Sequence, residues 1–94
     1  MDKILALQIA IRGLNSEQSD LIKYLAKYNG EPSIKAFKQF VKDCYVNNLF
    51  IFENYNSNEV ESVRIEYVVS VIPLVIDGDN LSYAKTDNEG NFVL

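Results

Sequence analysis

The spacing of apolar residues changes close to residue 48 and divides the chain into two halves. Before this point most apolar side chains recur every three or four positions, as in an amphipathic helix, whereas after it they alternate with polar ones, as in a strand. The pattern predicts an α+β fold in which two or three N-terminal helices pack on a C-terminal antiparallel β-meander of four to five strands. A length of 94 residues suits a single α+β domain over residues 1–94.

Residues 4–11 carry the patterns of both a helix and a strand. Every second residue from Leu5 to Ile11 is apolar, which is typical of a half-buried strand. Alanine, leucine and glutamine nevertheless favour a helix, and Arg12 followed by Gly13 is a common helix end. We interpret this segment as a helix, with a strand as the alternative.

A second helix is predicted from residue 15 or 16 to residue 28. Either Asn15 or Ser16 can serve as its N-cap, and Asn29-Gly30 is typical of its end. One face of this helix would be apolar, since the residues at positions i, i+3, i+4 and i+7 are Leu21, Tyr24, Leu25 and Tyr28.

The third predicted helix covers residues 33–47 and begins after Pro32, which suits a helix start. Its buried face is predicted to contain Ile34, Phe37, Val41, Cys44 and Tyr45, with Phe40 at the edge. Beside that face, three lysines would form one basic stripe, since they lie three and four residues apart: Lys35, Lys38 and Lys42.

The second half of the chain predicts strands joined by turns. Residues 49–55 and 63–71 have strand patterns, and two shorter strands follow at 81–86 and 92–94. Pro73 cannot donate to a sheet, so we expect the second of these strands to bend, end or lie at an edge there. The segments 77–80 and 87–90 are rich in Asp, Asn and Gly, which are turn residues, and they lack the length and ligand spacing of a calcium loop.

Charge is distributed unevenly along the chain. Residues 1–48 contain seven lysines and arginines against five acids, a balance of +2, whereas residues 49–94 contain two against eight, a balance of −6. The first half is therefore mildly basic and the second half distinctly acidic. Such an asymmetry points to an interaction with a charged partner.

The composition argues against catalysis. The chain has no histidine, the commonest general base and metal ligand, and its one cysteine, Cys44, lies on the predicted apolar face of a helix. We therefore expect no enzymatic activity, no metal site and no cofactor, with Cys44 as a buried core thiol.

A single cysteine favours a reducing, cytoplasmic location. The apolar runs are too short to cross a membrane, and we expect no signal peptide.

The leading hypothesis is a small acidic protein-binding module, an inhibitor or antagonist that blocks a basic groove of its partner. A rigid acidic surface can act as a nucleic-acid mimic there, because complementary potential speeds the encounter and fixes orientation. Immunity proteins and phage-encoded antagonists of nucleases are a physical analogy for this mode of action. The predicted contact residues are Glu53, Tyr55, Glu59, Glu61, Glu66, Asp77, Asp79, Asp87 and Glu89.

Two alternative functions remain open. Three helices followed by a hairpin is the element order of a winged helix, in which the lysine stripe (Lys35, Lys38 and Lys42) would contact DNA or RNA. The acidic hairpin and the absence of arginine from the stripe weigh against it. The third hypothesis is an assembly subunit, in which an exposed strand at 49–52 or 92–94 pairs with another chain, for example in a homodimer.

Overall fold

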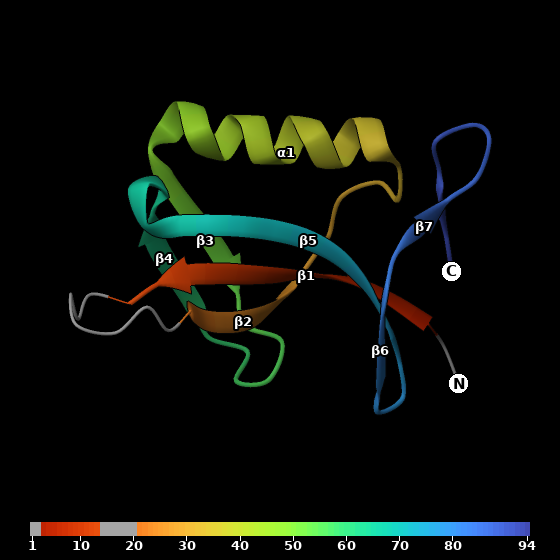
Figure 1. Ribbon diagram of the computed structural model, residues 1–94, viewed down its shortest axis with the longest axis horizontal. Coiled ribbons are helices and arrows are strands. Elements are labelled where there is room, and N and C mark those ends of the chain that lie inside the picture. The colour runs from red at the N-terminus through yellow and green to blue at the C-terminus, as the bar shows by residue number, and fades with distance from the viewer. Residues whose placement is uncertain (1–2, 14–20) are drawn as a thin grey trace.

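The computed structural model describes residues 3–13 and 21–94, and in this part of the chain one α-helix accompanies eight strands (Figure 1). The helix α1 spans Ile34–Asn47. The strands are β1 (Lys3–Arg12), β2 (Leu21–Lys27), β3 (Leu49–Glu53), β4 (Val60–Arg64), β5 (Val68–Asp77), β6 (Asn80–Tyr83), β7 (Lys85–Thr86) and β8 (Phe92–Val93). A short 3-10 turn, η1, covers Ile65–Tyr67 between β4 and β5.

Four strands form the main sheet in the order β2-β1-β5-β6, with every neighbouring pair antiparallel. The long strand β1 lies inside this sheet, where Leu7 is directly opposite both Ala26 of β2 and Pro73 of β5. Paired residues share a face of a sheet, so the odd-numbered side chains of β1 all project to one side. We call that side the inner face and the opposite side the outer face.

The hydrophobic core lies on the inner face, between the sheet, α1 and the β3–β4 hairpin (Figure 1). Phe50 of β3 is fully buried at its centre, with its ring centroid 5.6 Å from that of Phe40 and 6.0 Å from that of Phe52. Burying a phenylalanine of this kind contributes roughly 2–3 kcal/mol. The buried residues of this core are Leu5, Leu7, Ile9, Ile11, Ala26, Phe37, Cys44, Phe50, Phe52 and Phe92.

The β7–β8 hairpin is attached to the start of α1. Phe92 donates its backbone N–H to the carbonyl of Pro32 (2.7 Å), and Ser33 forms an isolated bridge with Asn91. The ring of Phe92 meets that of Phe37 edge to face, with centroids 6.1 Å apart. The end of the chain is thus connected to the same core as the first strand.

The predicted two or three N-terminal helices on a meander of four to five strands are wrong, because the described residues are mostly β, with one α-helix and eight strands in three sheets. Residues 4–11 belong to β1, so the strand alternative was the correct interpretation of that segment. Ala6 and Ala10 are buried on the face opposite Leu5 and Leu7, so β1 has apolar residues on both faces, which explains its misleading helix-forming composition.

The second predicted helix is also wrong over its described part, since residues 21–27 form β2. Tyr24 and Ala26 pair with odd-numbered residues of β1 on the inner face, whereas Leu25 pairs with Gln8 on the outer face. Apolar residues on both faces of one strand produced a spacing of three and four by coincidence. The proposed caps at positions 15 and 16 lie outside the described residues.

The third predicted helix is confirmed as α1. Ser33 is its N-cap, accepting a hydrogen bond from the backbone N–H of Ala36 (3.2 Å), and Asn48 ends the helix in a left-handed conformation (φ 58°). Its buried side is narrower than predicted, because Ile34 and Tyr45 are exposed while Phe37 and Cys44 are buried.

The strand predicted over 63–71 is interrupted. Its alternating residues run from the end of β4 through η1 into β5, so one pattern spans two strands and the turn that joins them. Pro73 lies within β5 and does not end it. The predictions agree with the structure for strands β3 and β8. They also agree for the two turns that contain left-handed glycines, Gly78 (φ 64°) and Gly90 (φ 81°).

None of the helices in the described part of the chain is long and apolar enough to cross a membrane.

Candidate protein-binding site

Four of the predicted contact residues lie together on the β3–β4 hairpin. Glu53 ends β3 opposite Val60, and Glu61 in β4 lies opposite Phe52. Tyr55 and Glu59 belong to the six-residue connection, 54–59, that joins β3 to β4. We call Glu53, Tyr55, Glu59 and Glu61, with the intervening loop 54–58, the acidic hairpin loop.

Asn54 organises this loop through both its backbone and its side chain. Its side-chain oxygen accepts from the backbone N–H groups of Asn56 (2.9 Å) and Ser57 (3.3 Å), and its side-chain nitrogen donates to Glu61 (2.8 Å). Its backbone N–H donates to the carbonyl of Glu59 (2.8 Å). An asparagine that bonds to the backbone two residues ahead is a well-known turn former, so the loop has a defined conformation before any partner binds.

Strand β2 holds the loop from the other side. The backbone N–H of Tyr55 donates to the carbonyl of Leu25 (2.8 Å), next to an isolated bridge between Ala26 and Asn54. The ammonium group of Lys27 lies 3.0 Å from the Glu53 carboxylate and 2.6 Å from the side-chain oxygen of Asn58. These contacts are why the hairpin loop lies beside β2.

The acidic hairpin loop carries a net negative charge. It contains three carboxylates, from Glu53, Glu59 and Glu61, and of these Glu53 pairs with the ammonium group of Lys27. The side chains of Lys27 and Glu53 are 34% and 36% exposed, so salt screens this pair and it contributes little to folding stability. Glu59 is exposed, and no ion pair of its carboxylate is found among the described residues.

The remaining predicted acids lie elsewhere. Glu66 is in η1 and pairs with Arg64 (2.9 Å), while Asp77 ends β5 and Asp79 lies in the β5–β6 turn. Asp87 accepts from the backbone N–H groups of Glu89 and Asn91 and so forms its own turn. Figure 1 shows the β3–β4 loop, the β5–β6 turn and the β7–β8 turn at three separate places. The structure therefore does not bring all nine predicted residues onto one surface.

The lysine stripe is present on α1. Lys35, Lys38 and Lys42 are all exposed, and within the described residues none of them forms an ion pair. Asp43 on the same helix accepts a hydrogen bond from Gln39 (2.8 Å). The stripe is therefore a solvated side of the helix, available to a ligand but not shaped into a site.

Cys44 and Tyr28 have raised pKa values. Burial, reinforced by the charge of Asp43, raises the pKa of the Cys44 thiol, so this buried thiol is protonated at neutral pH and a weak nucleophile. Burial and the nearby Glu31 likewise raise the pKa of Tyr28, whose hydroxyl donates to the carbonyl of Glu31 (2.8 Å). Among residues 3–13 and 21–94, no three carboxylate or thiol groups gather as a metal site would require.

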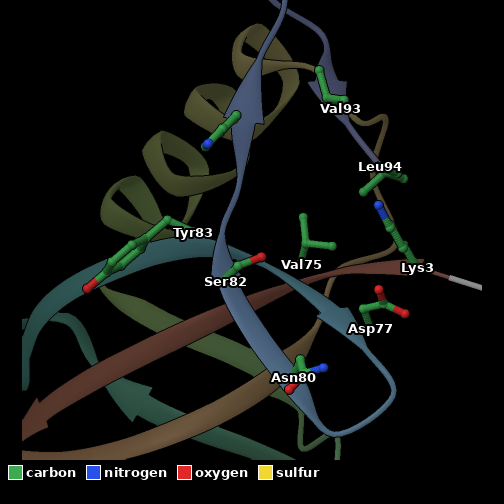
Figure 2. A pocket seen from close by; sticks show the side chains of 9 residues that line it. Lys3, Val75, Asp77, Asn80, Ser82, Tyr83, Val93 and Leu94 are labelled. Atoms are coloured by element: carbon green, nitrogen blue, oxygen red, sulfur yellow. The ribbon is translucent and has the colours of Figure 1, made fainter.

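A shallow, open cavity of about 320 Å³ lies beside β6, on the inner-face side of the sheet. Its charged lining residues are Lys3, Asp77 and Lys85, from three different strands. Figure 2 shows Ser82 and Val75 facing this space, with Lys3 and Asp77 close to one another at its far side. The mixed charges give the cavity no clear preference for a ligand.

Sequence reasoning missed the residues that shape the hairpin loop. Lys27 lies in a segment that was predicted as a helix, and its role depends on a pairing with Glu53, which is 26 residues away. No local pattern indicates such a contact. The asparagines at 54, 56 and 58 are turn-forming residues, and this was the one local signal of an ordered loop.

Comparison of the chain with models of known protein families, with curated proteins and with solved structures finds no match. The residues of the site therefore carry the evidence for function.

Proposed function

We propose that this chain is a non-enzymatic protein-binding module that places its acidic hairpin loop against a basic surface of a partner protein. By occupying a groove that would otherwise hold an anionic substrate, such as nucleic acid, it acts as an inhibitor. The carboxylates of Glu53, Glu59 and Glu61 supply the negative charge, and Tyr55 adds an aromatic ring beside them.

The observation that supports this proposal is the prior ordering of the loop. Asn54 bonds to three backbone or side-chain groups of the hairpin through its side chain alone, and β2 holds the loop through Tyr55 and Lys27. A loop that is ordered before binding loses less conformational freedom in the complex, so more of its electrostatic attraction appears as affinity. A solvated run of acids would lack this advantage.

Two charge-matched double variants test the proposal. Glu59→Lys with Glu61→Lys reverses two charges on the acidic hairpin loop, whereas Glu66→Lys with Glu89→Lys makes the same change in net charge at two other predicted acids. Each tagged variant and the original chain would be immobilised and used to capture proteins from nuclease-treated cell lysate at moderate salt. Circular dichroism would confirm that each variant is folded.

We expect a stoichiometric protein band with the original chain and with the Glu66/Glu89 control, and its loss with the Glu59/Glu61 variant. The captured complex should weaken as salt rises, because the attraction is between exposed charges. Equal capture by both double variants would contradict the proposal and place the interface elsewhere.

A further inference from the structure

Strand β4 is an open edge of the β3–β4 hairpin. The hairpin forms a sheet of its own with only two strands, and among residues 3–13 and 21–94 nothing pairs with the side of β4 that faces away from β3. An uncovered edge presents unpaired N–H and C=O groups to any extended chain that approaches. This edge lies directly beside the acidic hairpin loop, because Glu59 precedes β4 and Glu61 belongs to it.

The hydrogen bonds at the two ends of the hairpin identify which backbone groups of β4 are free. Asn54 donates its N–H to the carbonyl of Glu59 (2.8 Å), and Ile65 donates its N–H to the carbonyl of Asn48 (3.3 Å). Residues of an antiparallel pair bond to the partner strand at every second position. The odd-numbered residues of β4 therefore bond toward β3, and the N–H and C=O groups at positions 60, 62 and 64 point away from it.

The side chains along this edge combine negative charge with an exposed apolar residue. Side chains alternate between the two faces of a strand, so Glu59 and Glu61 lie on one face of the hairpin and Val60 lies on the other. Glu61 accepts a hydrogen bond from the side chain of Asn54 (2.8 Å), which holds its carboxylate beside the edge. Val60 is 73% exposed and offers an apolar contact between the two acids.

We propose that an extended segment of the partner protein pairs antiparallel with β4 and carries lysine or arginine at every second position. Two of its cations then lie opposite Glu59 and Glu61, and the residue between them lies opposite Val60. Position 61 does not bond outward, so its side chain comes closest to that of the added strand. This inference rests on the proposed function and names the part of the partner that the chain recognises.

A second copy of this chain cannot supply these cations. Residues that lie opposite one another in an antiparallel pair share a face of the sheet. Among residues 59–65 the one cation is Arg64, which lies on the face opposite to Glu59 and Glu61. Pairing of β4 with its own copy would set both acids against odd-numbered residues, which are acidic or apolar. Charge therefore favours a basic segment of a different protein.

Binding of a labelled synthetic peptide that alternates lysine and valine tests the pairing, with a peptide that alternates glutamate and valine as its control. Fluorescence anisotropy would measure the dissociation constant of the full chain for each peptide. We expect the basic peptide to bind and the acidic peptide not to bind. Ser62→Pro removes one outward N–H and leaves the bonds to β3 intact, so it should weaken binding about tenfold, whereas Ser62→Ala should not.

Amide hydrogen exchange of the unmodified chain gives a readout that needs no variant. Without peptide, the N–H groups at positions 60, 62 and 64 should exchange fast and those at 61 and 63 slowly. The basic peptide should slow exchange at 60, 62 and 64, because a paired strand accepts or donates hydrogen bonds there. Attraction between charges alone would leave these amides unprotected.

Three results would overturn the strand pairing. They are failure of the basic peptide to bind, binding without slower exchange at positions 60, 62 and 64, and equal binding by the Ser62→Pro and Ser62→Ala variants. If these amides stay unprotected while the Glu59/Glu61 variant still loses the partner band from lysate, the proposed function stands and only the strand pairing is wrong.

Discussion

Asn54 shows how a single side chain can determine the shape of a binding loop. Its amide accepts two backbone hydrogen bonds and donates one to Glu61, and its backbone N–H closes the hairpin onto Glu59. No other residue that the structure describes within loop 54–58 makes as many contacts. The conformation of the acidic hairpin loop therefore depends on this residue more than on the acids themselves.

Replacing Asn54 with alanine removes the three side-chain hydrogen bonds. We expect the free energy of unfolding to fall by about 1.5–3 kcal/mol, because three hydrogen bonds are lost and each contributes about 0.5–1 kcal/mol. Urea denaturation would measure the change, with Asn56→Ala, an exposed neighbour, as the control. A loss equal to that of the control would mean that the loop is ordered by other contacts.

Cys44 and Tyr28 make the free energy of unfolding decrease at alkaline pH. Burial raises the pKa of both groups above their ordinary values of 9.0 and 10.0, since it disfavours the charged thiolate and phenolate. The folded state therefore holds these protons more tightly than the unfolded state, so their contribution is complete below about pH 9 and is lost as the pH rises through the folded pKa values.

Urea denaturation from about pH 8 to about pH 11 measures this effect. We expect the free energy of unfolding of the original chain to decrease over that range, and the Cys44→Ala and Tyr28→Phe variants to show a smaller decrease. The slope is the readout, because both variants also lose packing or a hydrogen bond at every pH. Slopes identical to that of the original chain would contradict the assigned burial effect.

At the scale of the elements, the sequence predicts a helix or strand correctly where neighbouring residues determine it. The prediction fails where contacts between distant residues determine the secondary structure. The helix α1 follows from a cap, a periodic face and a left-handed end, all within residues 33–48. Strands β1 and β2 do not follow from local signals, because both faces of each strand carry apolar residues. The face to which each residue belongs is known only from its pairing with the neighbouring strands. Loss of two predicted helices also removes the element order on which the winged-helix alternative was based.

The lysine stripe of α1 supports a prediction of its own. We expect the chain not to bind duplex DNA even at low salt, because its net charge is −4 and the exposed stripe of Lys35, Lys38 and Lys42 contains no arginine. Fluorescence anisotropy with labelled duplex DNA would test this. Binding that is lost when the three lysines are replaced by alanine would instead favour the nucleic-acid alternative.

At the scale of the whole molecule, different elements carry different surfaces. The helix presents lysines, and the β3–β4 hairpin presents acids beside β2 and the open edge of β4. The charge asymmetry between the two halves was evident in the sequence. The sequence also indicated an acidic hairpin around Glu53, Glu59 and Glu61. It did not reveal that the other five C-terminal acids lie away from this hairpin, since that depends on how the strands pair.

The most direct test of the central claim is a nuclear magnetic resonance titration of the isotope-labelled chain with its captured partner. If the acidic hairpin loop is the interface, the amide signals that change most will be those of residues 53–61 and of the neighbouring β2 segment 23–27. Changes confined to α1 around residues 35–42, with the hairpin signals unmoved, would contradict it.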